Sequence, residues 1–120
     1  MTPSSERHAA VHDLLEAAGF IPYQVIADGH RIGESVSGFV ILESGDGKTL
    51  VRLRPGDDWL SGVASVQAEA GLEDIGTAEY AHSVSILSDW SRALKAHGYT
   101  VGQRNSRTLV ILDPAKAAER

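Results

Sequence analysis

The sequence predicts an α+β fold, with a single antiparallel sheet of hairpins and with helices packed on one face of that sheet. Turn signals divide two stretches of the chain into short strand-forming segments, which is typical of hairpins. Apolar residues recur with a helical period at the start and in the middle of the chain. The strands come in groups and do not alternate with helices, which favours α+β over a parallel α/β sheet. We expect one domain over residues 1–114 and a flexible tail over residues 115–120.

The composition narrows the class of protein. The chain has 120 residues, of which 42% are hydrophobic, and it carries a net charge of −5. This length allows one core of modest size, and the hydrophobic content is that of a folded domain. There is no cysteine, which excludes a disulfide framework, a thiolate zinc site, an iron–sulfur cluster and a cysteine nucleophile.

The location of the protein is inferred from two absences. Residues 1–7 lack the basic region and apolar run of a signal peptide. The longest apolar run, residues 39–42, is far short of the roughly 20 residues that cross a bilayer. We therefore expect a cytoplasmic protein with no membrane partner. Arginine outnumbers lysine, and alanine and glycine are plentiful, which is typical of bacterial proteins from GC-rich genomes.

The first predicted element is a helix over residues 4–18. Its apolar residues fall on one stripe, at i, i+3, i+4 and i+7 from Val11 to Ala18. Gly19 is placed to end this helix in a left-handed conformation.

Two hairpins are expected next, one around Asp28-Gly29 and one around a turn at residues 44–47. Their strands are predicted over residues 23–27 and 30–32 for the first hairpin, and over residues 37–43 and 48–54 for the second. The continuous apolar run at residues 39–42 predicts a strand that is covered on both faces. The partial alternation of residues 50–54 predicts that one face of the next strand meets solvent. Pro55-Gly56 ends this part of the sheet.

A short helix is predicted over residues 59–70, with Asp57 or Asp58 as its cap and Gly71 at its end. The two neighbouring carboxylates suit capping better than they suit an acid–base pair, because side chains of adjacent residues usually diverge. Glu73-Asp74 is expected to lie in a solvated loop.

A longer helix is predicted over residues 78–97. In the alternative interpretation, residues 80–87 form a strand and Ser88 caps a shorter helix. A final hairpin is expected to pair residues 99–102 with residues 108–112.

Three possible metal ligands, His8, His12 and Glu16, are spaced four residues apart on the first helix. The general-base glutamate of a His-Glu-x-x-His motif is absent, and Glu16 lies well round on the polar side of the helix. We therefore expect a solvated helix flank and no metal site.

Two glycine-containing segments come near to catalytic motifs. Residues 33–38 have Ser37 where the nucleophile elbow of serine hydrolases needs glycine. Gly47-Lys48-Thr49 ends like a phosphate-binding loop, but Leu42 stands where that loop needs glycine. With no complete motif, the sequence predicts no catalytic residue, no cofactor and a protein that is not an enzyme.

Charge is distributed unevenly along the chain. Between Arg54 and Arg92 every charged residue is acidic: Asp57, Asp58, Glu69, Glu73, Asp74, Glu79 and Asp89. Between Asp89 and Asp113 every charged residue is basic: Arg92, Lys95, Arg104 and Arg107. Blocks this separated predict a surface with an acidic end and a basic end.

Two classes of function follow from these observations. The first is a small non-catalytic interaction or regulatory module that binds a protein partner or self-associates as a homodimer through its acidic and basic surfaces. The second is a nucleic-acid-binding protein, in which the helix over residues 78–97 and the following hairpin act as recognition helix and wing. In that hypothesis Arg92, Lys95, Arg104 and Arg107 meet phosphates, against a net charge of −5 that repels them. A small enzyme or a ligand-binding pocket in the sheet is a weaker third hypothesis.

Overall fold

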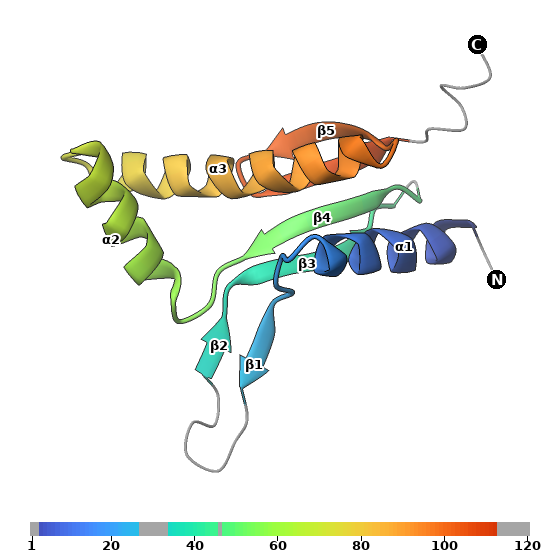
Figure 1. The fold of residues 1–120 in the computed structure, drawn as a ribbon, viewed down its shortest axis with the longest axis horizontal. Coiled ribbons are helices and arrows are strands. Elements are labelled where there is room, and N and C mark those ends of the chain that lie inside the picture. The colour runs from blue at the N-terminus through green and yellow to red at the C-terminus, as the bar shows by residue number, and fades with distance from the viewer. Residues whose placement is uncertain (1–2, 27–33, 46, 113–120) are drawn as a thin grey trace.

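The computed structural model describes residues 3–26, 34–45 and 47–112 (Figure 1). In chain order, its helices and strands are α1 (Pro3–Ala17), β1 (Gln24–Ile26), β2 (Glu34–Val36), β3 (Gly38–Glu43), β4 (Thr49–Arg54), α2 (Trp59–Ala70), α3 (Ile75–Ala96), β5 (Thr100–Asn105) and β6 (Thr108–Leu112). The predicted α+β class is confirmed, because the helices pack against one four-stranded antiparallel sheet.

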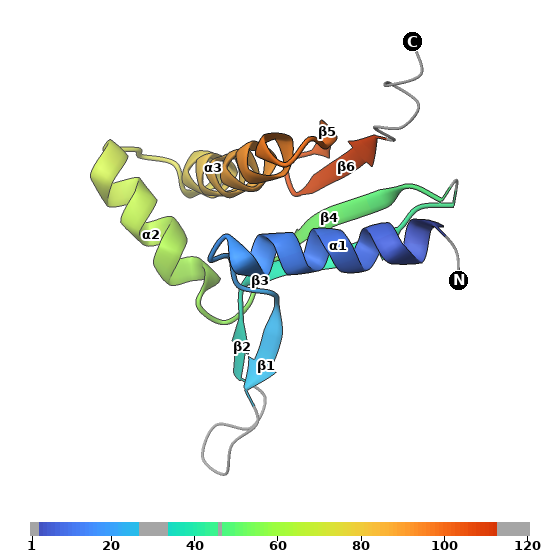
Figure 2. The ribbon, with the colours of Figure 1, turned by 45° about the vertical axis from the view of Figure 1, so that its right-hand side comes forward.

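The strands of this sheet lie in the order β3-β4-β6-β5, so β4 and β6 occupy its middle. The register places Ile41 opposite Val51 and Val51 opposite Leu109, which puts these three side chains on one face. Both α1 and α3 contact the strands and each other, whereas α2 packs against α3. In Figures 1 and 2, α2 and the first turns of α3 extend beyond the end of the sheet.

The core lies between the sheet and the two helices α1 and α3. Among its most deeply buried side chains are Val11 and Leu15 of α1, Phe39 of β3, Val51 of β4, Val63 of α2, Ala78, Leu87 and Leu94 of α3, and Ile111 of β6. Phe39 connects the layers, because its ring meets Trp90 of α3 at 6.0 Å and His12 of α1 at 5.3 Å, edge to face in both cases.

The predicted helices are confirmed, with α3 forming one continuous helix of 22 residues. The alternative strand over residues 80–87 is wrong, because Ser83 and Leu87 lie on the buried stripe of that helix. The expected exposed loop at Glu73-Asp74 is confirmed. Asp74 also caps α3, since its carboxylate accepts hydrogen bonds from the Thr77 N–H at 2.9 Å and the Thr77 hydroxyl at 3.0 Å. None of the described helices is long and apolar enough to cross a membrane.

The predicted hairpins agree with the structure to different degrees. The hairpin of β3 and β4 is confirmed. In the first hairpin, Ile26 pairs with Glu34, and the resulting β1–β2 ribbon is a separate two-stranded sheet that projects from the body (Figures 1 and 2). The predicted Asp28-Gly29 turn, the strand over residues 30–32 and the tail over residues 115–120 lie outside the described residues.

In the last hairpin, β5 extends to Asn105, further than predicted. Pairing continues past a bulge between Gln103 and Asn105. The Asn105 side chain then closes the turn by accepting a hydrogen bond from the Arg107 N–H at 2.9 Å.

The outer edge of β3 is covered by the segment that precedes β1. The Phe39 N–H donates to the Ile21 carbonyl at 3.3 Å, and the Tyr23 N–H donates to the Phe39 carbonyl at 3.0 Å. This close crossing requires glycine at position 38, because a Cβ atom there would overlap the backbone of residues 21–23.

Replacing Gly38 with alanine should therefore destabilise the fold. We expect Gly38→Ala to lower the free energy of unfolding by about 1–3 kcal/mol, since the backbone on either side must move apart. Gly45→Ala is the matched control, because a Cβ atom at Gly45 meets nothing within 4 Å. Denaturant unfolding of the two variants checks the prediction, and equal midpoints would contradict it.

Candidate functional site

The face of the sheet opposite α1 and α3 is apolar in its centre, and none of the helices in the described part of the chain packs on it. Because side chains alternate along a strand, this face carries the residues that do not point into the core. They are Val40 and Leu42 of β3, Leu50, Arg52 and Arg54 of β4, Thr108, Val110 and Leu112 of β6, and Thr100 and Gly102 of β5. No carboxylate occurs among these described positions. We call this surface the arginine face.

The prediction that residues 39–42 form a strand covered on both faces is wrong for the single chain. Phe39 is fully buried, but Leu42 is 38% exposed and Val40 is only half-buried. The helices cover one face of β3 and leave the other to solvent. The expectation that one face of β4 meets solvent is confirmed by the exposed Arg52 and Arg54.

Arg52 and Arg54 lie two residues apart on β4, and therefore on the same face. The guanidinium of Arg54 stacks over the Tyr23 ring, 4.5 Å from its centroid. Within the described part of the chain, neither arginine has a carboxylate partner. Beside them is a hollow of about 280 Å³, lined by Val40, Leu42, Arg52, Arg54 and Pro55. The arginine face thus combines an apolar floor with two unpaired positive charges.

The connection between α2 and α3 is acidic. Glu69 in the last turn of α2 and Glu73 and Asp74 in the connection are all exposed, and Ile75, the first residue of α3, has 56% of its surface in solvent. Hydrogen bonds from the Thr77 hydroxyl and N–H lower the pKa of the Asp74 carboxyl, so it stays charged at neutral pH. We call these four residues the acidic tip.

The four basic residues singled out from the sequence do not share one environment. Arg107 makes an ion pair with Glu79 at 3.1 Å, and its guanidinium lies 5.7 Å from the Trp59 ring. Arg92 pairs with Asp89 of its own helix at 3.5 Å. Arg107 and Lys95 therefore lie at different places along α3. Glu79, which pairs with Arg107, and Lys95 are 16 residues apart on this helix, which separates their positions by about 24 Å.

The four basic residues are separated because β5 runs antiparallel to α3 (Figure 1). This carries the turn between β5 and β6 towards the N-terminal half of α3, so Arg107 joins the acidic block there. Lys95 instead lines a groove of about 260 Å³ between α3 and β5, opposite Gln103. Arg104 is exposed on β5.

Asp57 and Asp58 do not cap α2 with their side chains. Asp58 occupies the cap position but makes no capping hydrogen bond. Its carboxylate accepts hydrogen bonds from the Ser37 N–H at 2.8 Å and the Ser37 hydroxyl at 2.6 Å, while Asp57 accepts one from the Ser35 N–H at 2.7 Å. The acidic pair therefore fastens the start of α2 to the segment between β2 and β3. The sequence did not indicate this, because the partners are about twenty residues apart.

The same junction contains Ser35 and Ser37, which belong to the segment over residues 33–38 that comes near to a nucleophile elbow. The Ser35 hydroxyl oxygen accepts a hydrogen bond from the Asp57 N–H at 3.1 Å, and the Ser37 hydroxyl oxygen accepts one from the Gly56 N–H at 2.7 Å. A Cβ atom at Gly56 would overlap the backbone of residues 35–37, so the two chain segments are in direct contact. These contacts give both serines a structural role.

His82 packs between α2 and α3. Its ring lies 4.6 Å from the Trp59 ring, and a side chain at Gly62 would strike it. Burial lowers the pKa of the His82 imidazole below 6.5, and the Asp58 carboxylate only partly offsets this effect. The imidazole is therefore mainly neutral at pH 7.

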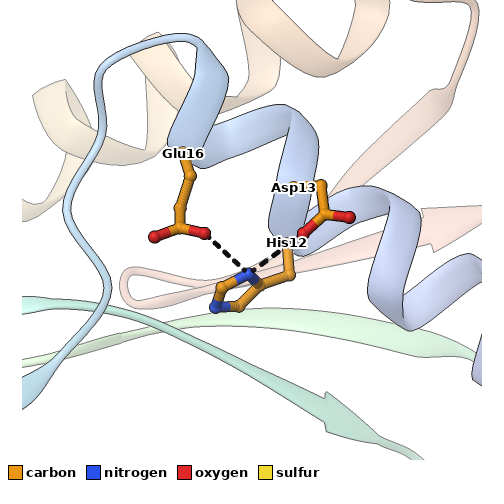
Figure 3. A group of neighbouring side chains, drawn as sticks. All are labelled: His12, Asp13 and Glu16. Atoms are coloured by element: carbon orange, nitrogen blue, oxygen red, sulfur yellow. Dashed lines mark ion pairs between the residues drawn. The ribbon is translucent and has the colours of Figure 1, made fainter.

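A second acidic cluster lies on α1 (Figure 3). His12 Nδ1 is 3.3 Å from Glu16 Oε1 and 3.7 Å from Asp13 Oδ1, and one ligand atom from each side chain fits within 4.8 Å. His8, which the sequence placed in this row, is not part of the cluster. The contacts account for the arrangement without a metal, because His12 packs its ring edge against Phe39 and its Nδ1 side faces Glu16 one turn along the helix.

Comparison of the chain with protein-family models, with curated proteins and with solved structures found no match.

The Asp58–Ser37 contact predicts a pH-dependent contribution to stability. Burial acts to raise the pKa of the Asp58 carboxyl, but the hydrogen bonds from Ser37 outweigh it, so the pKa lies below 3.8. At neutral pH, Asp58→Asn should lower the free energy of unfolding by about 1 kcal/mol, because Ser37 loses a charged acceptor.

A depressed pKa in the folded state stabilises the fold above the unfolded-state pKa, and the effect disappears as the pH falls through the folded-state value. The difference between the parent and Asp58→Asn should therefore shrink below about pH 3.8. Glu43→Gln, the same kind of substitution at an exposed position on β3, is the control and should change stability by less than about 0.5 kcal/mol. A difference of the same size in denaturant unfolding at neutral and at acidic pH would contradict the prediction.

Proposed function

We propose that this protein is a small non-catalytic interaction module, and that the arginine face is the surface with which it binds an acidic protein partner. The observation that carries the proposal is the apolar centre of this face of the sheet, where the described residues include no carboxylate and offer none as a partner to Arg52 or Arg54. Leu42 exposes 38% of its surface there. Burying these aliphatic side chains against a partner stabilises the complex by about 25 cal/mol per Å² of apolar surface removed from water.

The charges on this face determine the kind of partner. A purely apolar partner would bury two guanidinium groups without compensation, which costs several kcal/mol per charge. An acidic partner supplies carboxylates that arginine binds with two parallel hydrogen bonds. The face therefore suits a protein surface that combines apolar side chains with Asp or Glu, and the association should weaken with salt.

Nucleic-acid binding by α3 and the hairpin of β5 and β6 is the alternative that the sequence raised. It is less favoured by the contacts, because Arg107 is engaged by Glu79 and Arg92 by Asp89. Fluorescence anisotropy with labelled duplex DNA, single-stranded DNA and RNA at two salt concentrations separates the alternatives. Salt-sensitive binding that is lost in Arg92→Ala/Lys95→Ala would favour the helix and hairpin over the arginine face.

A photo-crosslinking amino acid at position 42 tests the proposed function directly. In a lysate of the source cells, we expect the Leu42 variant to form a crosslinked protein product, because its side chain lies exposed beside Arg52 and Arg54. The product should disappear when Arg52→Glu/Arg54→Glu is added. The same group at Ser85, an exposed position on α3, is the control and should give no such product.

Either a dimer of the chain or a complex with another acidic protein would support the proposed function. The absence of a product at position 42, or a product that is insensitive to the two arginine substitutions, would contradict it.

A further inference from the structure

The arginine face is unsuited to binding its own copy face to face. Such a pair would bring Arg52 and Arg54 of both copies together with no carboxylate on either described face. Like charges that meet in an interface cost several kcal/mol. If the chain associates with itself, the arginine face must therefore meet a different part of the second copy, and that part must be acidic.

Most carboxylates of the acidic block are already engaged within the chain. Asp57 and Asp58 hold Ser35 and Ser37, Glu79 pairs with Arg107, and Asp89 pairs with Arg92. Within the described residues, Glu69 and Glu73 have no ion-pair partner. They lie at the acidic tip with Asp74, which caps α3 through two hydrogen bonds and remains charged.

The acidic tip also offers an apolar side chain. Ile75 directly follows Asp74 and is 56% exposed at the start of α3. In Figures 1 and 2, the connection between α2 and α3 lies at the far end of the helices, beyond the sheet. Within one chain, the acidic tip is therefore not placed against the arginine face.

We propose that the acidic tip of one copy docks on the arginine face of a second copy. Glu69, Glu73 and Asp74 then face Arg52 and Arg54, and Ile75 enters the hollow of about 280 Å³ beside Val40. This inference rests on the proposed function, because it names the partner of the same face. A twofold axis allows two such contacts in one closed dimer. In each contact, the acidic tip of one copy lies on the arginine face of the other.

Two charge-reversed variants test this contact. In Arg52→Glu/Arg54→Glu, the sheet face and the tip are both acidic, and in Glu69→Lys/Glu73→Lys both are basic. Each variant alone should lose self-association by more than about tenfold in Kd, because like charges meet. In a mixture of the two, every acidic surface meets a basic one, so a heterodimer should form with an affinity near that of the parent. Sedimentation equilibrium at low salt measures each Kd.

Arg92→Glu/Lys95→Glu is the matched control. Like Arg52→Glu/Arg54→Glu, it replaces two basic residues by glutamate, but on α3 and away from the arginine face. Both residues belong to the basic set that the sequence singled out. Its self-association should equal that of the parent. Circular dichroism melts of all variants show whether they are folded.

The outcomes separate this inference from the proposed function. If Arg52→Glu/Arg54→Glu weakens the dimer while Glu69→Lys/Glu73→Lys leaves it intact, or if the mixture does not associate, the acidic tip is not the partner and the inference is overturned. If the parent stays monomeric while the crosslink at position 42 persists, the face binds another acidic protein, so the inference fails and the proposed function stands. If the α3 control alone weakens the dimer, self-association uses that helix and the inference is overturned, while the crosslink at position 42 decides whether the proposed function stands.

Discussion

The pairing of β4 with both β3 and β6 is the interaction on which the rest of the structure depends. β3 and β4 form a local hairpin, but β6 comes from the far end of the chain, and the match of Val51 with Leu109 joins the two halves. This pairing brings α3, which connects α2 to the last hairpin, onto the same face as α1. The core around Phe39 and Trp90 then closes between them.

The side chains of β4 alternate between the core and the arginine face. Val51 and Leu53 are buried in the core, whereas Arg52 and Arg54 point to the opposite face. Because β3 and β6 are apolar on both faces, the second face acquires an apolar floor that the single chain leaves open. This floor, in which Leu42 is exposed while Leu50 and Thr108 are buried, and the two arginines follow from the same register. The candidate interaction surface is therefore inseparable from the fold.

Local patterns predicted most of the elements, and long-range contacts account for the differences. The periodic stripe around Val11 and the hairpin of β3 and β4 depend on near neighbours, and both predictions are confirmed. The partner of Asp58 is 21 residues away and the partner of Arg107 is 28 residues away, so neither contact was visible in the sequence. The alternation that exposes Arg52 was visible, but the face left uncovered is decided by the pairing of β4 with β6.

The central proposal is that the arginine face of one copy meets the acidic tip of a second copy. Amide chemical shifts of the pure protein, recorded by NMR from high to low concentration, test it most directly. The account predicts concentration-dependent shifts at Leu42, Arg52 and Arg54 and at Glu73 on the acidic tip, with constant shifts at Glu16 on α1. Shifts that move on α1 or at Arg92 and leave β4 unchanged would contradict it.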